Sequence, residues 1–388
     1  MRILFVHSRY QIPGGEESVV EAEIQLLRSH GHEVWRYERD NHEVDGRNRI
    51  GLLRDTLWSA SSHDAVHRLV KEHAIDVVHV HNTLPLVSPS VYWAAGRAGA
   101  AVVQTLHNFR WLCPQGTLLR DGRICEDCVG KVAWRAVQHR CYRDSAVQSA
   151  VMTTTYGLHT ALGSLHRQAD RIIALTDFAR NKFIEGGFPA DKLVVKPNFV
   201  EDAAFAQPLA PTPRSGLLYV GRLSVEKGPD VLVEAARQVP EARFDVLGHG
   251  PLADTLDRPA NVRFAGAVPK AEVIEAMQRA QALVLPSRCY EGLPMTLVEA
   301  LCQGLPVIAS RLGAFPSLVE DGVTGLLFDP GDSGDLARKV RWCREHPDAM
   351  ARMGQAARAV YLARYTAQSN LALLLGIYRD AIRHRQSR

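Results

Sequence analysis

Glu291 and Glu299 bracket the segment EGLPMTLVE, and their type and spacing suit the binding of a polyhydroxylated anion. The preceding run ALVLPS (282–287) predicts a buried strand, and the following run MTLVEALCQG (295–304) predicts a short helix. Glu291 is then expected in the strand-to-helix loop, with Glu299 about two turns further along. A helix N-terminus attracts anions, and the flanking carboxylates can hold hydroxyl groups on either side. Such a layout fits a nucleotide sugar.

Two more polar segments also follow predicted strands. PGGEE (13–17) contains Gly14 and Gly15, which would let backbone N–H groups approach a phosphate, although a plain turn explains this pattern equally well. GRLSVEKG (221–228) contains Arg222 and Lys227, which can converge on one diphosphate. Basic pairs are usually solvated surface cations, but this one is flanked by glycines at a strand end.

Two weaker patterns complete the set. LGHGP (247–251) carries Gly248 and Gly250, which permit a close turn where a base can stack, without the third glycine of a dinucleotide fingerprint. TLHN (105–108) places His107 at a strand end, where it can contact a sugar or a transition-state charge. The pattern VHN at 80–82 repeats it, so either His81 or His107 can be a packed structural histidine.

The positions of these segments predict a fold of two doubly wound α/β domains. A chain of 388 residues favours two domains. Short apolar runs alternate with helical patterns, which is typical of parallel sheets covered by helices. The predicted strands are 2–8, 76–82, 101–107 and 171–176 in the first half, and 216–223, 243–248, 262–268, 282–287, 306–310 and 325–328 in the second.

The domain boundaries follow from composition. The segment 201–216 is rich in Pro and Ala without periodicity and is the predicted linker. We therefore expect domains at 1–200 and 201–362, with 363–388 forming a helix that packs back toward the N-terminal domain. In open α/β sheets ligands bind at the carboxyl ends of the strands, so the functional cleft is expected between the two domains.

Composition excludes several classes of protein. A net charge of +4 does not indicate nucleic acid. The N-terminus enters a strand pattern directly and no apolar run reaches membrane-spanning length, so a cytoplasmic protein is expected. In that compartment the seven cysteines are expected to be free thiols or metal ligands rather than disulfides.

Taken together, these segments resemble retaining glycosyltransferases of family 4, which have the GT-B fold, and the resemblance covers nearly the whole chain. It implies that the N-terminal domain takes the acceptor and the C-terminal domain the nucleotide sugar. Glu291 would bind hydroxyls of the donor sugar and Glu299 the ribose, while Arg222 and Lys227 would neutralise the departing diphosphate. His107 would lie near the donor hexose. Further donor contacts would come from Gly14, Gly15, Gly248, Gly250, Val268, Gly292, Leu293, Pro294 and Thr296.

The resemblance also implies the chemistry. A hexose would pass from a nucleoside diphosphate sugar to an acceptor hydroxyl with retention of configuration, in bacterial polysaccharide, lipopolysaccharide or lipid-linked glycan biosynthesis. Neither glutamate is assigned as a nucleophile. The chain has no D-x-D run, which suits catalysis without a metal or other cofactor. One departure is that four residues, RCYE, follow Ser287 where many family members have three.

A Cys-rich insertion at about 108–145 is the least ordinary part of the chain. It contains Cys113, Cys125, Cys128 and Cys141, and Cys125-x-x-Cys128 is a chelating pair. Four such ligands suit a structural zinc, with His139 as a substitute ligand. Only one such pair is present, however, and cysteines are also common core residues.

The insertion is also basic and aromatic, with Arg110, Trp111, Lys131, Trp134 and Arg143 among its members. Such side chains suit an anionic membrane interface, so we expect a glycan or lipid-linked acceptor and peripheral association with the inner face of the cell membrane. A solvated lobe that only packs is the simpler alternative. Two other functions stay open: a sugar-nucleotide epimerase or other GT-B enzyme such as a phosphorylase, and a non-catalytic basic binding protein.

Overall fold

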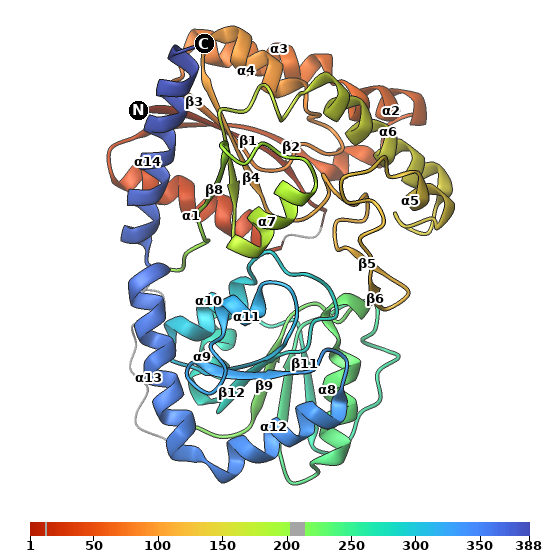
Figure 1. Ribbon diagram of the computed structural model, residues 1–388, viewed down its shortest axis with the longest axis vertical. Coiled ribbons are helices and arrows are strands. Elements are labelled where there is room, and N and C mark those ends of the chain that lie inside the picture. Colours follow the sequence, from red (N-terminus) through yellow and green to blue (C-terminus); the bar gives the residue numbers. More distant parts are fainter. Residues whose placement is uncertain (12–13, 202–213) are drawn as a thin grey trace. The chain divides into compact units, whose positions relative to one another are not determined.

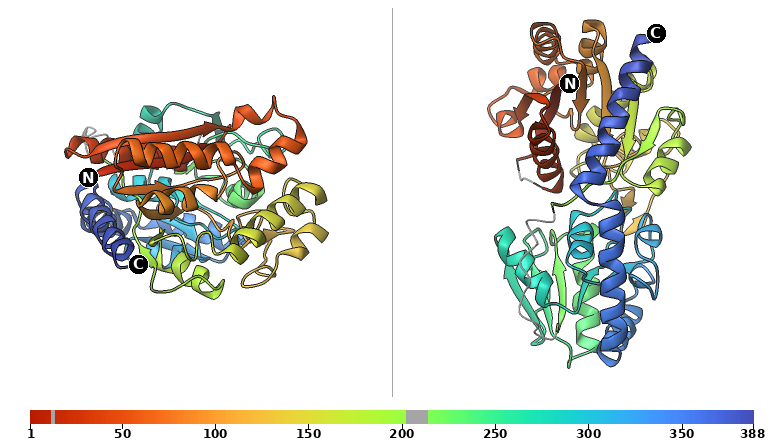
Figure 2. Two further views of the ribbon diagram at one scale, coloured as in Figure 1. Left: turned by 90° about the horizontal axis from the view of Figure 1, so that it is seen from above. Right: turned by 90° about the vertical axis from the view of Figure 1, so that its left-hand side faces the viewer.

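A computed structural model describes residues 1–11, 14–201 and 214–388. These residues form two compact units, each built around its own six-stranded sheet. Unit 1 comprises Met1–Gly116, Glu126–Pro197 and Asn370–Arg388, and unit 2 comprises Thr117–Cys125 and Asn198–Ser369. Figure 1 labels the helices and strands of both units, and Figure 2 shows that the two chain termini lie near the same end of unit 1.

The sheet of unit 1 has the strand order β2-β1-β3-β4-β7-β8, and all its pairs are parallel. Its strands are β1 (Arg2–Arg9), β2 (Glu33–Asp40), β3 (Val77–Val80), β4 (Ala101–Leu106), β7 (Arg171–Ala174) and β8 (Leu193–Val195). Its helices are α1 (Gly15–Ser29), η1 (Asn41–Val44), α2 (Arg49–Leu57), α3 (Ala60–Glu72), α4 (Ser90–Ala98), α5 (Trp134–Gln138), α6 (Ala146–Leu162), α7 (Asp177–Glu185) and most of α14 (Ala367–Gln386).

The sheet of unit 2 has the order β11-β10-β9-β12-β13-β14 and is also parallel throughout. Its strands are β9 (Leu217–Val220), β10 (Phe244–Leu247), β11 (Val262–Gly266), β12 (Ala282–Leu285), β13 (Val307–Ser310) and β14 (Gly325–Phe328). Its helices are η3 (Val225–Lys227), α8 (Pro229–Gln238), α9 (Lys270–Arg279), α10 (Met295–Cys302), α11 (Phe315–Leu318), α12 (Ser333–Glu345) and α13 (Pro347–Arg364). A small antiparallel hairpin of β5 (Leu119–Arg120) and β6 (Arg123–Ile124) also groups with this unit.

The central strands are continuous apolar runs because helices bury both faces of a parallel sheet. Ile3, Leu4, Phe5 and Val6 of β1 have no exposed surface, and all four residues of β12 are buried. In unit 2, α8 and α12 pack together and contribute Leu232, Ala236, Leu336 and Val340 to the core beside β9 and β10.

The prediction of two doubly wound α/β sheets is confirmed. Each of the ten predicted strands is present, whereas β2 and β8 of the unit 1 sheet and the short strands β5 and β6 were missed. The predicted linker at 201–216 lies mostly outside the described residues. Three boundaries of the units differ from the predicted domains. Residues 117–125, inside the insertion, group with unit 2, which resumes at Asn198 rather than at 201. The final segment of unit 1 begins at Asn370 rather than at 363.

Candidate active site

The candidate site of unit 2 lies at the switch point of its sheet. Counted along the chain, the strand order reads 3-2-1-4-5-6, which reverses direction between β9 and β12. Crevices outside the carboxyl ends of two such strands are where open α/β sheets bind ligands. Residues 221–228 follow β9 and residues 286–294 follow β12, so the fold brings two of the predicted segments to this one position.

Glu291 and Lys227 form an ion pair across the switch point. The Nζ of Lys227 lies 2.7 Å from Oε1 and 2.9 Å from Oε2 of Glu291, and the Ser287 hydroxyl donates to Oε1 at 2.8 Å. The Glu291 side chain is 11% exposed and that of Lys227 is 33% exposed. Burial acts to lower the pKa of Lys227, but the Glu291 carboxylate outweighs it and holds that pKa above its ordinary value. Lys227 is therefore held as an ammonium beside Glu291, and solvent can reach the pair.

Glu299 has a comparable partner. Its buried carboxylate forms an ion pair with Lys270, which begins α9 and is mostly exposed. Because α10 begins at Met295, Glu299 is the fifth residue of the helix, a little over one turn from its start. Pro294 is the N-cap residue of α10, with Leu293 buried and Gly292 and Thr296 half-buried beside it.

Close backbone packing explains the glycines of this edge. A Cβ on Gly228 would lie 2.1 Å from the carbonyl oxygen of Pro286, and one on Gly248 would lie 1.9 Å from that of Gly221. A Cβ on Gly250 would meet the Leu223 carbonyl oxygen at 2.4 Å. The loops after β9, β10 and β12 therefore stack without room for side chains. The role of Gly248, Gly250 and the half-buried Val268 in binding a base stays a prediction.

Arg222 differs from Lys227 in being exposed. Its backbone carbonyl accepts a hydrogen bond of 2.7 Å from the Tyr219 hydroxyl, which fixes the loop, and the described residues offer its guanidinium no ion pair. A guanidinium held at a loop without a partner of its own can chelate a phosphate bidentately.

The candidate site of unit 1 lies at the corresponding place in its sheet. There the order reads 2-1-3-4-5-6, with the switch point between β1 and β3. Gly14 is the N-cap residue of α1. Its N–H donates to Glu17 at 2.7 Å, and the N–H of Tyr10 donates to the same carboxylate at 3.0 Å. A phosphate at Gly14 would therefore compete with Glu17, while Gly15 is exposed at the helix start.

His107 and His81 are hydrogen-bonded to each other, with His81 Nδ1 2.8 Å from His107 Nε2. Burial, with further repulsion from His7 and Lys196, lowers the pKa of His107 to about 3. Both histidines line a pocket of about 30 Å³ together with Glu16, Arg110 and Tyr156. The sequence left open whether His81 or His107 is a packed structural histidine. In the structure the two rings are hydrogen-bonded to each other and both line the pocket.

Glu16 is a residue of this pocket that sequence reasoning missed. Its carboxylate lies 3.3 Å from the Tyr10 hydroxyl and 3.8 Å from His7 Nδ1. Burial raises its pKa to about 7, although His7 and Arg110 oppose the shift. A carboxyl that titrates near neutral pH in a pocket is a candidate for ligand binding or proton transfer. Its position directly after Gly14-Gly15, at the mouth of α1, was the available signal.

The side chains of the insertion divide into two groups. Arg110 stacks over the Tyr10 ring at 5.3 Å, and Trp111 packs against Tyr156 and Phe188, so these two belong to the pocket and core rather than to a membrane surface. Lys131, Trp134 and the later arginines are exposed.

Of the four cysteines of the insertion, Cys113 is buried and the others are half-buried. Within the described ranges, one group of three or more potential ligand side chains has its atoms within 4.8 Å of one another, and it consists of Glu23, His79 and His81. A structural zinc on the cysteines stays a prediction.

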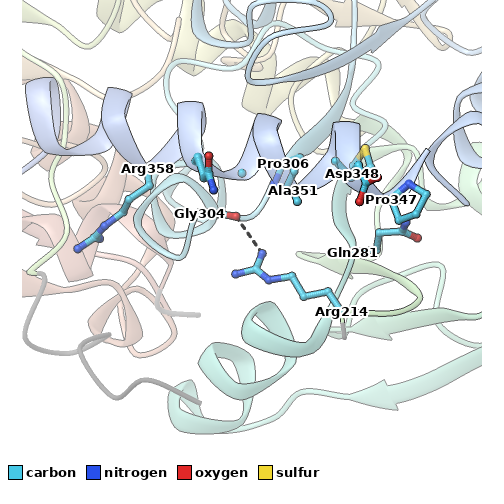
Figure 3. A pocket seen from close by; sticks show the side chains of 11 residues that line it. Arg214, Gln281, Gly304, Pro306, Pro347, Asp348, Ala351 and Arg358 are labelled. Carbon is cyan, nitrogen blue, oxygen red and sulfur yellow. Dashed lines mark hydrogen bonds between the residues drawn. The ribbon is translucent and has the colours of Figure 1, made fainter. Parts of the chain in front are cut away.

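A larger pocket, of about 620 Å³, lies elsewhere in unit 2 (Figure 3). Its lining residues Gln281 and Pro306 immediately precede β12 and β13, so it opens at the amino ends of the strands. Arg214 donates from this pocket to the carbonyl oxygens of Gly304 and Gln303 at 3.0 and 2.6 Å, capping the end of α10. None of the predicted donor-binding residues lines this pocket, so its size does not make it the candidate site.

Comparison with known proteins identifies a family for each half of the chain. Residues 13–204 match the family described as Glycosyltransferase Family 4, and residues 200–360 match the family described as Glycosyl transferases group 1. The first match contains the candidate residues of unit 1, and the second contains those of unit 2.

Individual relatives vary in how much they share. D-inositol 3-phosphate glycosyltransferase of Thermobifida fusca is 32% identical over 337 residues, covering 79% of this chain and 70% of the relative. Sulfoquinovosyl transferase of Arabidopsis thaliana is 34% identical over 150 residues, covering 37% of this chain but only 29% of the relative. The solved structure of HepE from Anabaena with UDP and glucose has a TM-score of 0.69 at 20% identity, covering 97% of this chain and 99% of that one, and so shares the fold.

Proposed function

Because the chain belongs to the GT-B glycosyltransferases that combine a family 4 segment with a group 1 segment, we propose that it transfers a hexose from a nucleoside diphosphate sugar to an acceptor hydroxyl. The observation that carries this proposal is the Lys227–Glu291 pair at the switch point of unit 2. The pair places the Lys227 ammonium, which can bind phosphate, in hydrogen-bond contact with the Glu291 carboxylate, which can bind sugar hydroxyls.

Donor binding would exchange the partners of this ion pair. A diphosphate entering between β9 and β12 would attract Lys227 and the exposed Arg222, and Glu291 would then accept hydrogen bonds from sugar hydroxyls. The α10 N-terminus at Pro294 adds free N–H groups and a positive dipole end to the same place. Glu299, one turn along, would receive the ribose. The complex of HepE with UDP and glucose supports a nucleoside diphosphate sugar as the donor.

Leaving-group stabilisation is the main catalytic contribution in this proposal. Negative charge grows on the diphosphate as the glycosidic bond breaks, and fixed cations and helix N–H groups stabilise it without reorganisation. Lys227 and Arg222 would supply this charge, so no metal is required in the mechanism. Both glutamates are engaged by lysines, an arrangement that suits holding hydroxyls rather than attacking carbon. Retention of configuration would then follow from front-face attack, and NMR of the product anomer tests it.

The acceptor would bind through unit 1. Glu16, Arg110 and Tyr156 line the pocket beside His107, so a carboxyl, a guanidinium and a phenol are available to hydroxyl or phosphate groups there. We propose a lipid-linked or glycan acceptor, in keeping with bacterial polysaccharide, lipopolysaccharide or lipid-linked glycan biosynthesis.

A face of unit 1 supports membrane docking for such an acceptor. The described parts of the chain have eleven exposed large apolar residues, and seven of them lie on or next to the helices α2, α5 and α6. These seven are Ile50, Leu53, Val132, Trp134, Val147, Leu158 and Leu162. The 17 residues of α6 include no Asp, Glu, Lys or Arg, although Val147 is 74% exposed. We call this surface the α2–α5–α6 face.

Cations border the α2–α5–α6 face. Lys131, Arg135, Arg140 and Arg143 are exposed beside α5 and α6, and Arg49 and Arg54 are exposed on α2. Apolar side chains surrounded by basic ones suit the interface of an anionic bilayer. The apolar side chains can insert into the headgroup layer, and the anionic lipids attract the basic side chains. In the described residues no helix is long and apolar enough to cross a bilayer, so docking at one leaflet is the form of contact proposed, at the cytosolic face.

The direct test is a turnover assay. The purified chain is incubated with glucose conjugates of UDP, GDP and ADP, and release of the nucleoside diphosphate is followed with and without EDTA. We expect slow donor hydrolysis with one nucleotide, unchanged by EDTA. Complete inactivity with every donor, in a folded protein and with membrane lipid extract supplied as acceptor, would remove the proposal.

A further inference from the structure

The hydrogen bond between His81 and His107 raises the question of which ring donates. Burial lowers the pKa of both histidines, so both rings are neutral at physiological pH. At His81 the pKa is lowered further by the neighbouring groups His79, His107, His7 and Lys196. A neutral imidazole carries one N–H and one bare nitrogen. Of His81 Nδ1 and His107 Nε2, 2.8 Å apart, one must therefore donate and the other accept.

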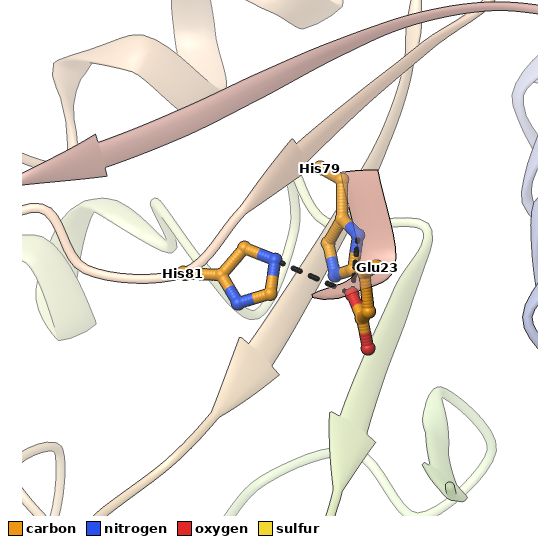
Figure 4. Close-up of side chains that lie close together, drawn as sticks. All are labelled: Glu23, His79 and His81. Atoms are coloured by element: carbon orange, nitrogen blue, oxygen red, sulfur yellow. Dashed lines mark ion pairs between the residues drawn. The ribbon is translucent and has the colours of Figure 1, made fainter. Parts of the chain in front are cut away.

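The other nitrogen of His81 faces a buried carboxylate. His81 Nε2 lies 3.7 Å from Oε2 of Glu23, which comes from α1 (Figure 4). Both atoms are buried, and neither has a hydrogen-bond partner among the described residues. The opposite carboxylate oxygen of Glu23 is 2.6 Å from Nζ of Lys196, and both of these side chains are fully buried. A fixed ion pair thus presents negative charge to His81 Nε2.

This charge selects one tautomer. A bare nitrogen would direct its lone pair at the carboxylate, which is repulsive in a dry interior, whereas an N–H there is attracted. His81 therefore carries its proton on Nε2 and accepts on Nδ1. His107 must then donate from Nε2, which leaves its Nδ1 bare. The described residues offer that Nδ1 no hydrogen bond, although the ring lines the pocket with Glu16 and Arg110.

We propose that Glu23 and His81 are positioning residues that hold His107 in its Nε2–H tautomer, so that its bare Nδ1 accepts a hydrogen bond from a ligand hydroxyl. The identity of that hydroxyl, a donor or acceptor sugar, rests on the proposed function. The bare Nδ1 of His107 can accept a hydrogen bond from a hydroxyl group, but its lone pair repels a phosphate oxygen. His107 therefore favours hydrogen-bond donors as ligands. Phosphate binding is thereby left to the cations of unit 2.

A metal ion is the alternative occupant for this cluster, since Glu23, His79 and His81 have ligand atoms within 4.8 Å of one another. Two observations favour the positioning role. Lys196 already supplies the counter-charge of Glu23, and an ammonium there repels a second cation. Both nitrogens of His79 are engaged, Nδ1 with the Tyr378 hydroxyl at 2.7 Å and Nε2 with the Thr105 hydroxyl at 2.8 Å.

Ring-selective ¹⁵N NMR of histidine in the ligand-free full chain tests the proposal without any substrate. Protonated and bare ring nitrogens resonate far apart, so each tautomer is read directly. We expect His107 and His81 both as Nε2–H tautomers, unchanged between pH 6 and 8. Observation of His107 with its proton on Nδ1 overturns the proposal, whatever any variant does. Stoichiometric zinc chloride should leave the His79 and His81 signals in place, and a shift of both would assign them to a metal instead.

A double variant tests the role of the carboxylate. E23Q/K196M removes both charges together, which avoids leaving one buried ion unpaired. We expect the His107 signals to split between the two tautomers. The control T105V removes a partner of His79 in the same cluster and should leave the His107 tautomer unchanged. An unaltered Nε2–H signal in E23Q/K196M would show that Glu23 does not select it.

Kinetics connect the tautomer to turnover. In E23Q/K196M we expect kcat to fall in proportion to the share of His107 that has left the Nε2–H tautomer, about twofold for an even split, with little change in donor KM, because the hydrogen bond is lost in that share while the phosphate contacts remain. Unaltered kcat in a variant with mixed tautomers would break the link to function. Conversely, a fixed tautomer in a chain that turns over no nucleotide sugar would leave the positioning intact and remove the proposed function.

Discussion

At the switch point of unit 2 two carboxylates are paired with lysines at the surface, whereas at that of unit 1 burial strongly shifts the pKa values of a histidine and a carboxyl. Glu291 and Glu299 each have a lysine partner that solvent can reach. In unit 1, burial holds the pKa of His107 near 3 and that of Glu16 near 7. The same doubly wound architecture therefore yields one edge that can exchange an ion pair for a diphosphate and one that can hold hydroxyls by neutral hydrogen bonds.

The largest effect should come from removing the carboxylate of the charged site. For E291A we expect donor turnover to fall on the order of a thousandfold, because a group that contacts the reacting sugar is lost and Lys227 loses its partner. Circular dichroism should show an intact fold. The control E275A removes one side of an exposed ion pair on α9 and should change turnover less than twofold. Residual activity of E291A above a tenth of wild type would contradict the assigned role.

The next effect concerns the cation. K227M should lower kcat on the order of a hundredfold, because the leaving diphosphate loses a fixed positive charge. Raising the salt concentration should not reproduce this loss in the wild type, since a half-buried ammonium is screened less than a surface one. The matched variant K71M, at an exposed position of α3, should behave as wild type. Equal kcat in K227M and K71M would assign leaving-group stabilisation elsewhere.

A pH series sharpens the contrast with unit 1. If the Glu16 carboxylate accepts from an acceptor hydroxyl, kcat/KM should rise up to about pH 7, and E16Q should lose this limb and run about tenfold lower on the plateau. Stability gives an independent check. The folded chain keeps this proton up to about pH 7 and the unfolded chain releases it near 4.5, so Glu16 contributes stability below pH 4.5 that is lost as pH rises to 7.

That contribution is roughly 3 kcal/mol for a pKa raised from 4.5 to about 7. Urea titrations at pH 4.5 and 7.5 should therefore show wild type losing more stability than E16Q over the interval. Burial acts to raise the pKa of Glu17, but the nearby His7 and hydrogen bonds from the N–H groups of Tyr10 and Gly14 lower it to about 2, so Glu17 stays ionised throughout this range. Parallel curves for wild type and E16Q would show that Glu16 titrates normally.

The smallest effect contrasts the surfaces of the two units. V147S on the α2–α5–α6 face should weaken co-sedimentation with phosphatidylserine vesicles about fivefold, because one exposed apolar side chain contributes roughly 1 kcal/mol at an interface. V323S, at an exposed position of unit 2, is the matched control and should bind as wild type. Equal binding by both variants, or none by the wild type, would leave the α2–α5–α6 face without a membrane partner.

The two units also differ in how much of them the sequence predicts. All six strands of the parallel sheet of unit 2 were predicted, because each lies in a short, mainly apolar run. In unit 1, β2 is an edge strand whose sequence EVWRYERD mixes charged and aromatic residues, and β8 has only three residues. Neither has the continuous apolar run on which the other predictions depended.

The site divides in the same way. Lys227 and Glu291 were predicted from strand-end positions, and the fold brings them to within a hydrogen bond. Glu23, by contrast, is in the third turn of α1, and its contacts come from His79 of β3, from His81 just after that strand and from Lys196, 173 residues away. Glu16 acquires its shifted pKa from burial. Such properties depend on long-range packing that no local spacing encodes.

The most direct test of the central claim is a thermal-shift panel of UDP, GDP and ADP on wild type, K227M and K71M, with and without EDTA. Ligand at a hundred times its dissociation constant adds about 2.7 kcal/mol of stability, which raises the melting temperature measurably. We predict a clear rise for one nucleotide, indifferent to EDTA, retained in K71M and largely lost in K227M. No rise with any nucleotide, or a rise equal in all three proteins, would contradict a diphosphate site at the switch point of unit 2.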